Sequence, residues 1–286
     1  MDAHRSEFSV DKLCRILGVA RSGYYANKKH ILSPRQRHQQ EVLRALIALY
    51  EKQPAAGLDM LYHMLKPQFH CSRNMVHRLM KKHNIHSIRK RAYVTTTNSK
   101  HNYTVSPNLL KRDFSADKPN YKWVGDITYI PTDEGWLYAA TVKDLCTKKI
   151  VGYAFSEHID SKLTVAALKM ACNRQKPSGK LIFHSDRGSQ YTSKEYRKAL
   201  KEHHITQSMS RKGDPYDNTV AENFFSCLKC ELIHHAHYNN RQEAITDVFA
   251  YIETFYNSVR PHSSIGYLTL NDYEKRISSV YAAKAA

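Results

Sequence analysis

The sequence predicts a protein of the α/β class, in which a mixed sheet with helices is preceded by small all-α modules. Up to about residue 85 the apolar residues recur at helical spacing, whereas β-rich runs begin only after Pro119. Beyond the third of these runs, helical segments alternate with a short apolar strand. The length of 286 residues exceeds one ordinary domain, so we expect a core of about 150 residues with smaller modules.

The N-terminal segment has the pattern of a helix-turn-helix. Leu13, Ile16 and Leu17 stand at helical spacing, Gly18 marks a turn, and a second short helix carries Arg21. In such a unit the second helix enters the major groove of DNA, which makes Arg21 a candidate DNA contact. A small helical hairpin without DNA contact would show the same pattern, so that alternative stays open.

A second helical module follows. Apolar spacing indicates three helices, of which the second stops at Pro67 and the third is capped by Ser72. We expect the methionines of these helices to be ordinary core residues. The third helix presents basic residues outward, among them Arg73 and Arg78, and phosphate contact explains this basic face better than simple solvation.

Helical periodicity fades between residues 86 and 118. The segment contains Arg89, Lys90 and Arg91 and later a cluster of turn-forming residues. It is expected to be an extended basic linker that follows a DNA backbone between domains, with these three residues as DNA contacts.

The charge of the chain indicates a polyanionic partner. Lys and Arg number 44 against 26 Asp and Glu, which gives a formal charge of +18 and a pI near 9.6. Residues 1–118 hold 22 basic and 8 acidic residues, so the front of the chain carries most of the excess. Double-stranded DNA is the simplest partner, because neutralised phosphates release condensed counterions. Solubility alone is the weaker explanation for so large an excess of one sign.

The order of elements after Pro119 is that of a ribonuclease-H-like core. Three antiparallel strands are followed by a helix, a short buried strand, a second helix and further helices. This order describes a mixed sheet and differs from a doubly wound one. The expected strands are 122–130, 136–144, 149–156 and 181–184, and the expected helices cover about 163–171 and 193–203.

Three carboxylates occupy positions that suit divalent-metal chemistry on phosphates. Asp126 lies in mid-strand, Asp186 at the end of the short apolar strand, and Glu222 in a helical run. Two Mg²⁺ ions about 3.5–4 Å apart activate a nucleophilic oxygen and stabilise a leaving oxygen, and Mg²⁺ prefers oxygen ligands. We predict all three residues to be catalytic and to hold the metal. Taken singly, they would read as a strand Asp, a turn and a solvated helix residue.

Helical spacing from Glu222 points to two further candidates. Lys229 lies two turns beyond it on the same helical stripe, and Asn218 one turn before it. We predict both to contact DNA next to the metals. An ordinary exposed lysine is nearly as common on a helix, and only the register with Glu222 favours the functional interpretation.

The cysteines and the hydropathy profile indicate an intracellular protein. Six cysteines are scattered through the chain, as expected of reduced cytosolic thiols. Cys227 and Cys230 have a zinc-like spacing, but a second cysteine pair is missing and the following histidines lack finger spacing. No apolar run approaches the roughly 20 residues of a membrane span, and the N-terminus is no secretory signal. We therefore expect a soluble cytoplasmic protein.

Three motifs in the second half of the chain resemble those of one family. They are HSDRGSQY at 184–191, GDPYDNTVAENFF at 213–225 and YNSVRPH at 256–262. They are similar to the core signatures of bacterial insertion-sequence transposases with a retroviral-integrase-like catalytic core, which move by a copy-out, paste-in route. The likeness extends over essentially the whole chain from Val10. Arg187, where glutamine is frequent, and Leu270-Asn271, where Thr-Pro or Ser-Pro is usual, depart from the family pattern.

The resemblance implies roles for individual residues. It makes Asp126, Asp186 and Glu222 an acidic catalytic triad, with Lys229 as its basic companion. The terminal motif is implied to lie near DNA, which adds Arg260 and His262 to the candidate DNA contacts. Arg187 of the first motif, next to Asp186, is a further candidate.

The resemblance also implies a reaction and partners. The expected reaction is Mg²⁺-dependent cleavage at element ends followed by attack of the freed 3′-hydroxyl on another phosphodiester, with two Mg²⁺ ions or Mn²⁺ in their place. The expected partners are the terminal inverted repeats, target DNA, further copies of the chain and the protein of an upstream reading frame, in the nucleoid. A ribonuclease-H-like nuclease and a non-catalytic DNA-binding regulator remain as alternatives.

These interpretations divide the chain into four parts. We expect a helix-turn-helix at 1–34, a second helical DNA-binding module at 35–85, a basic linker at 86–118 and the ribonuclease-H-like integrase core with C-terminal helices at 119–286. The chain begins at its own Met and shows no long heptad repeat, so we expect it to be the downstream product of a frameshifting element.

Overall fold

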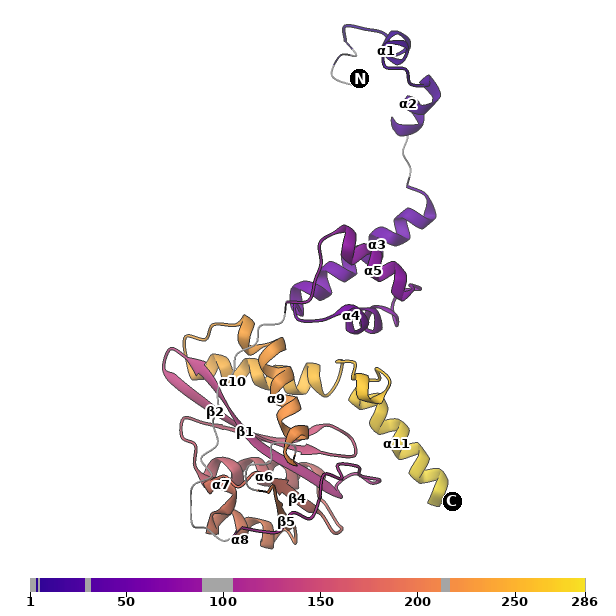
Figure 1. Ribbon diagram of the computed structural model, residues 1–286. Helices are drawn as coiled ribbons and strands as arrows, with labels where there is room; N and C mark the ends of the chain where they lie inside the picture. The colour runs from indigo at the N-terminus through magenta and orange to yellow at the C-terminus, as the bar shows by residue number, and fades with distance from the viewer. Residues whose placement is uncertain (1–3, 5, 29–31, 89–104, 212–216, 286) are drawn as a thin grey trace. The chain divides into compact units, whose positions relative to one another are not determined.

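The computed structural model describes residue 4 and residues 6–28, 32–88, 105–211 and 217–285 (Figure 1). Its contacts divide the chain into two compact units, Met1–Ala48 and Leu49–Ala286, which are treated separately below. The expected DNA contacts Arg89, Lys90 and Arg91 lie outside the described residues.

The first unit contains the helical hairpin that the sequence predicts. Helices α1 (Val10–Ile16) and α2 (Arg21–Lys28) are separated by a turn in which Gly18 has φ +62°, a left-handed conformation that glycine adopts without strain. Leu13 is buried, but Ile16 is 70% exposed. The apolar face of α1 is therefore narrower than the spacing alone suggested.

The three expected helices of the second module are α3 (Pro34–Lys52), α4 (Leu58–Leu65) and α5 (Arg73–Lys82). Ser72 caps α5 as predicted, because its hydroxyl accepts a hydrogen bond from the Met75 N–H over 3.2 Å. The inward positions of α4 and α5 are filled by apolar side chains. The buried ones are Leu61, Leu65, Val76 and Met80.

The core contains a mixed five-stranded sheet in the order β3-β2-β1-β4-β5. Strands β1, β2 and β3 form an antiparallel meander, whereas β4 pairs parallel to β1 and β5 parallel to β4. This is the ribonuclease-H-like arrangement predicted from the sequence. The strands are β1 (Lys122–Thr132), β2 (Gly135–Asp144), β3 (Ile150–Ser156), β4 (Ile182–Ser185) and β5 (Thr206–Met209). Strand β5 was not predicted, because its short run TQSM shows no apolar alternation.

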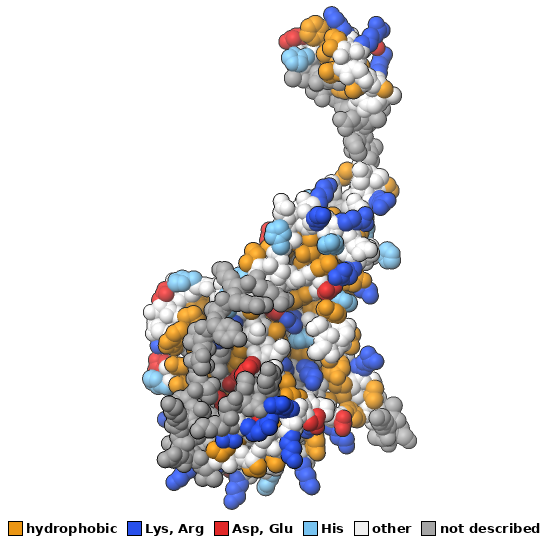
Figure 2. All heavy atoms as spheres, in the orientation of Figure 1, with side chains coloured by type: hydrophobic (Ala, Val, Ile, Leu, Met, Phe, Trp, Pro, Cys, Tyr) orange, Lys and Arg blue, Asp and Glu red, His pale blue; other side chains and the backbone are white. Residues whose placement is uncertain are grey.

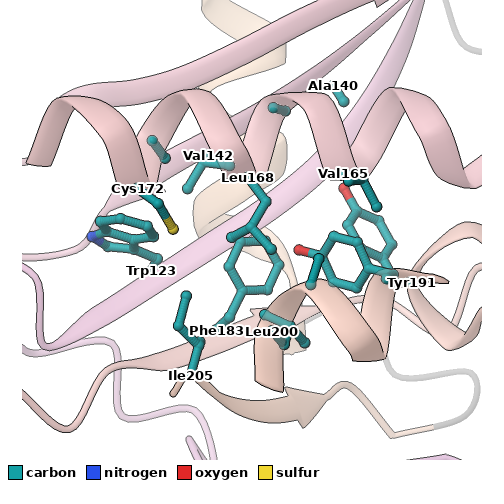
Figure 3. Close-up of a cluster of buried hydrophobic side chains, with 14 of the residues drawn as sticks. Trp123, Ala140, Val142, Val165, Leu168, Cys172, Phe183, Tyr191, Leu200 and Ile205 are labelled. Carbon is teal, nitrogen blue, oxygen red and sulfur yellow. The ribbon is translucent and has the colours of Figure 1, made fainter. Parts of the chain in front are cut away.

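One face of the sheet is covered by α6 (Ser161–Gln175) and α8 (Lys194–Glu202), with the single turn α7 (Ser189–Thr192) beside them. Figure 3 shows the core on this side, where Trp123, Leu168 and Phe183 meet. A Cβ on Gly152 would be only 2.4 Å from the Ala167 carbonyl oxygen, which shows how closely α6 approaches β3. Glycine at 152 thus permits this contact.

The opposite face packs against α9 (Thr219–Glu231) and α10 (Arg241–Ala250) (Figure 1). Phe224 and Leu228 of α9 share a buried cluster with Ile130 and Leu137 of the sheet. The remaining elements are the 3₁₀ turns Ile233–His235 and Ser263–Ile265, the π-helical segment Tyr251–Tyr256 that continues α10, and α11 (Leu270–Ala285).

The described part of the expected linker, residues 105–118, lies against the core. Leu110 is buried, and the Leu109 N–H donates to the Ser208 hydroxyl over 2.9 Å. Asp113 forms an ion pair with Lys122 over 2.8 Å. An extended basic linker was expected here because helical periodicity fades over residues 86–118, and the structure shows that Leu110 anchors the described part to the core.

The glycine at position 152 gives a test of the packing between α6 and β3. Gly152→Ala should lower the free energy of unfolding by about 1–3 kcal/mol, because the neighbouring atoms are backbone atoms of Ala167 and Ala171 and the Ala171 Cβ, which cannot move cheaply. Gly179→Ala is the matched control, since a Cβ there meets nothing within 4 Å. Urea denaturation measures both variants, and equal midpoints for the two would contradict the assigned contact.

Candidate active site

Asp126 lies in the middle of β1, the central strand of the sheet. Its Oδ1 accepts a hydrogen bond from the backbone N–H of Ile127 over 2.8 Å. Burial and the negative charge of Asp186 raise the pKa of Asp126 well above its usual value. The expected mid-strand acidic residue therefore occupies the centre of the sheet.

Asp186 reaches the same place through the parallel pairing of β4 with β1. Val124 pairs with His184, so Asp126 and Asp186 each follow two residues beyond this pair. The Gly188 N–H donates to Oδ1 of Asp186 over 2.9 Å. A Cβ at position 188 would lie 3.1 Å from that oxygen, so glycine allows the loop to approach the carboxylate.

Glu222 comes from the other face of the sheet, in the first turn of α9. Partial burial and the charge of Asp186 raise the pKa of Glu222, and Glu222 in turn contributes to the raised pKa of Asp126. Each of the three carboxylates is thus an electrostatic neighbour of the other two.

The chemistry of this acidic group suits a divalent cation. Mutual repulsion and burial disfavour three negative charges unless a cation compensates them. Oδ1 of the buried Asn218 accepts no hydrogen bond from any described residue, and amide and carboxylate oxygens are suitable ligands for Mg²⁺. Within the described ranges, no three His, Cys, Asp or Glu side chains have the geometry to hold a metal ion. The carboxylate and amide oxygens are of the kind that Mg²⁺ prefers, but the described His, Cys, Asp and Glu side chains are not arranged as a complete set of metal ligands.

Asn218 has a different environment from the predicted one. It immediately precedes α9 at the N-cap position and is buried, so it does not lie on the exposed stripe of that helix. Its side-chain amide hydrogen-bonds to Asp126, which lowers the pKa of that carboxyl and opposes the effects of burial and neighbouring charge. In this position Asn218 orients a carboxylate, and the predicted DNA contact finds no exposed side chain.

Lys229 lies beside the acidic group. Its Nζ is 4.3 Å from the centre of the Tyr129 ring, a cation–π contact. Burial lowers the pKa of Lys229, while the charge of Asp126 acts in the opposite direction. Arg187 directly follows Asp186 in the loop after β4, and its Nε donates to the Ser210 carbonyl oxygen over 2.6 Å.

His262 is buried and Arg260 is largely enclosed by protein partners, in contrast to the expected contact of both with DNA. Arg260 Nε donates to Glu231 Oε2 over 2.8 Å, and the arginine side chain is only 13% exposed. His262 bonds through Nε2 to the Tyr256 carbonyl oxygen over 3.0 Å, and burial lowers its pKa to about 4. Sequence reasoning assigned both to the surface because it could not see that α9 supplies Glu231 as a partner.

The candidates in the helical modules lie on the surface. Arg21 is exposed and lies 5.8 Å from the centre of the Tyr25 ring, and Arg78 is exposed on α5. Arg73 forms an ion pair with Asp59 over 2.6 Å. On the face shown in Figure 2, Lys and Arg side chains are scattered over all described parts of the molecule and do not form one compact patch.

The sequence analysis gave no role to Asp217, which fixes the start of α9. Its buried carboxylate pairs with Arg211 over 3.0 Å and with Arg112 over 3.4 Å, and it accepts from the Asn108 amide over 2.8 Å. His184 on β4 hydrogen-bonds to the Asp217 carbonyl oxygen over 2.9 Å. The only indication in the sequence was that Asp217 lies in the second motif, next to Asn218. Its role could not be predicted because, apart from Arg211, the side chains that bind its carboxylate are far away in the sequence.

Residues 116–215 match the integrase core domain family, and residues 203–269 match a second family of the same name. Residues 37–93 match the HTH-like domain family. The integrase core domain matches and the transposase relatives define the class of this protein as a polynucleotidyl transferase. None of the helices in the described part of the chain is long and apolar enough to cross a membrane.

Two curated relatives cover nearly the whole chain. Transposase InsF for insertion sequence IS3A of Escherichia coli is 38% identical over 96% of this chain and 97% of that protein. The uncharacterized 31 kDa protein of insertion element IS600 of Shigella sonnei is 42% identical over 89% of this chain and 94% of its own length. The chain belongs to this family of insertion-sequence transposases, and its function is that of a DNA transposase.

Among solved structures, the fold is similar to two catalytic domains at low sequence identity. The HTLV-2 integrase catalytic core domain in complex with magnesium is 16% identical, with a TM-score of 0.38 over 53% of this chain and 94% of that chain. The Mos1 transposase catalytic domain with Raltegravir and Mn is 13% identical, with a TM-score of 0.40 over 46% of this chain and 70% of that chain.

The Asp217 network predicts a pH-dependent stability. Hydrogen bonds from Arg211 hold the pKa of Asp217 well below its usual value, so this group stabilises the fold fully above about pH 4, the unfolded value. This contribution is lost as the pH falls from there toward the lower folded value. Asp217→Asn should cost about 2–4 kcal/mol at pH 7, and the difference from wild type should shrink below pH 4.

Denaturation with urea at several pH values measures this effect. Asp133→Asn is the control, because that carboxylate is more than half exposed. A difference between Asp217→Asn and wild type that stays constant from pH 7 to pH 3 would contradict the assigned network.

The buried ion pair of Arg260 gives a second prediction. Arg260→Ala should lower the free energy of unfolding by about 3–5 kcal/mol, because Glu231 is left buried without its partner. Arg276→Ala, which removes an exposed arginine from α11, should change it by less than about 0.5 kcal/mol. If Arg260→Ala leaves the stability unchanged and weakens DNA binding, Arg260 contacts DNA as first expected.

Proposed function

We propose that this transposase cleaves DNA at the ends of an insertion sequence and joins the freed 3′-hydroxyl to a second phosphodiester. The observation that carries the proposal is the convergence of Asp126, Asp186 and Glu222 from β1, the end of β4 and α9. Their mutual effects on pKa mark a site of concentrated negative charge in a chain of charge +18. Such a site favours metal-assisted chemistry on a phosphate held by the basic surface.

The three carboxylates would hold two Mg²⁺ ions, with Mn²⁺ as an alternative. Bound ions of this kind activate the attacking oxygen and stabilise the charge of the leaving oxygen. The chain itself orients the ligands. The Asn218 amide holds Asp126, and the Gly188 N–H holds Asp186, so both carboxylates keep a fixed direction before DNA arrives.

Lys229 is proposed as the basic companion of this site. It lies against Tyr129, with Asp126 as an electrostatic neighbour, which supports a contact with the phosphate beside the reacting one. The Arg187 guanidinium, tied to the carbonyl of Ser210, would fix the loop after β4 next to the DNA strand.

We propose that the helical modules at 1–34 and 35–85 and the basic segment at 86–118 hold DNA, whereas residues 119–286 form the catalytic core. Its candidate phosphate contacts are Arg21, Arg73, Arg78, Arg89, Lys90 and Arg91. Joining two element ends requires two active sites on paired DNA, so we propose a homo-oligomer on DNA, with the upstream-frame protein as a further partner. These partners place the reaction at the bacterial nucleoid.

Glu222→Gln tests the proposed function. With Mg²⁺ and a duplex that carries the terminal inverted repeats, the wild-type chain should give cleaved ends and strand-transfer products. The variant should lose both by at least about 100-fold, because it removes an anionic ligand, and should still bind the duplex. Glu202→Gln, on the exposed end of α8, is the matched control and should keep full activity.

The same assay separates the competing functions. Cleavage of any duplex without joining would identify a ribonuclease-H-like nuclease. Binding that is unaffected by metal, with no cut strand, would identify a DNA-binding regulator. Either result would replace the proposed transfer reaction.

A further inference from the structure

Trp136, at the start of β2, is a large aromatic side chain that the fold leaves half uncovered. It is 49% exposed, and it belongs to neither of the two buried clusters that flank the sheet. A single exposed apolar residue is ordinary on a protein surface. What distinguishes Trp136 is how firmly its backbone is held and what lies next to its ring.

The backbone of Trp136 is tied to the start of α10. Arg241 donates from Nε to the Trp136 carbonyl oxygen over 3.2 Å and from a terminal nitrogen to the Glu134 carbonyl oxygen over 2.7 Å. The Arg241 N–H also donates to the Glu134 carboxylate over 2.9 Å. The hairpin therefore presents the indole from a fixed position, which reduces the entropy lost when a ligand binds.

The indole is the outer member of a row that leads to the acidic site. Its ring meets that of Tyr129 edge to face, with centroids 5.0 Å apart and planes at 90°. On Tyr129 lies the Lys229 ammonium, 4.3 Å from the ring centre, and Lys229 has Asp126 as an electrostatic neighbour. An exposed aromatic surface, a cation and the proposed reaction site thus follow one another within one region of the core.

A nucleobase with its phosphate matches this row better than an apolar protein side chain does. Aromatic rings and cations placed together are the means by which proteins hold unpaired nucleotides, with the base stacked on the ring and the backbone near the cation. An apolar partner would gain from the indole but would have to desolvate Lys229 without compensation. The charge of +18 favours the nucleic acid as well.

We propose that Trp136 stacks on an unpaired base of the DNA strand held at the acidic site, with Lys229 against the adjoining phosphate. This inference rests on the proposed function. Within a duplex both faces of a base are covered by its neighbours, so the base must be frayed or turned out of the helix to reach the indole. The chain should therefore prefer DNA ends whose last base pairs are already open.

The two tryptophans of the chain make this contact directly measurable. Trp123 is completely buried and donates from Nε1 to Asp144 over 3.0 Å, whereas Trp136 is exposed. Quenching of tryptophan emission by a bound base reports Trp136 for this reason. The probe is a terminal-inverted-repeat duplex with its last three base pairs mismatched, compared with the fully paired duplex, in the absence of metal so that no strand is cut.

Trp136→Ala should weaken binding of the mismatched duplex about 5- to 100-fold and bring it to the level of the paired one. Trp136→Phe should retain most of the affinity, because it keeps an aromatic face, but should lose the quenching. Phe249→Ala is the matched control: Phe249 is 48% exposed and also meets a tyrosine, Tyr153, edge to face at 6.3 Å. The Phe249→Ala variant should bind both duplexes like wild type. Urea denaturation midpoints establish that each variant is folded.

Several results would overturn the proposal. Equal affinity of Trp136→Ala and wild type for the mismatched duplex would do so, and so would quenching that persists in Trp136→Phe. A change in the number of subunits with unchanged DNA affinity would assign the indole to a protein contact instead. Because the assay needs no cleavage, failure of strand transfer in the Glu222 experiment is a separate outcome from failure of this contact.

Discussion

The parallel pairing of β4 with β1 is the constraint on which the site depends. Its register, with Val124 opposite His184, sets Asp126 and Asp186 beside each other, although they are 60 positions apart in the sequence and β2, β3 and α6 lie between their strands. A shift of one residue would turn every side chain of β4 to the opposite face. Trp123 and Phe183, which pair in this register, are both buried in one core cluster, so a shifted register would lose their burial.

Bringing acidic groups together is unfavourable, and the neighbouring structure compensates for it. The raised pKa values of Asp126 and Glu222 record the repulsion and burial that folding imposes on them. The Asp217 network opposes this cost through Arg211, and His184 joins β4 to the backbone that precedes α9. The unfavourable charge repulsion among the three carboxylates is thus accompanied by favourable polar contacts just outside them.

The position of Asp126 could be predicted from the sequence, because an acidic residue within an apolar run that reads as a strand is placed by the strand itself. Its role in catalysis stays a prediction. The expectation that Arg260 and His262 lie near DNA came from the resemblance of their motif, whereas the structure encloses both side chains within the core. Their actual partners, Glu231 and the Tyr256 carbonyl oxygen, come from elements whose relative position the sequence does not contain.

The sequence by itself determined the mixed α/β class and the order of the elements except β5, because periodicity and turn residues are local properties of the chain. Only the tertiary structure decided that Asn218 orients Asp126, that residues 105–118 belong to the core, and that Trp136 continues a row through Tyr129 to Lys229. The physical reason is that burial and hydrogen-bond partnership arise between segments distant in sequence. Their free energies depend on distances that no local pattern specifies.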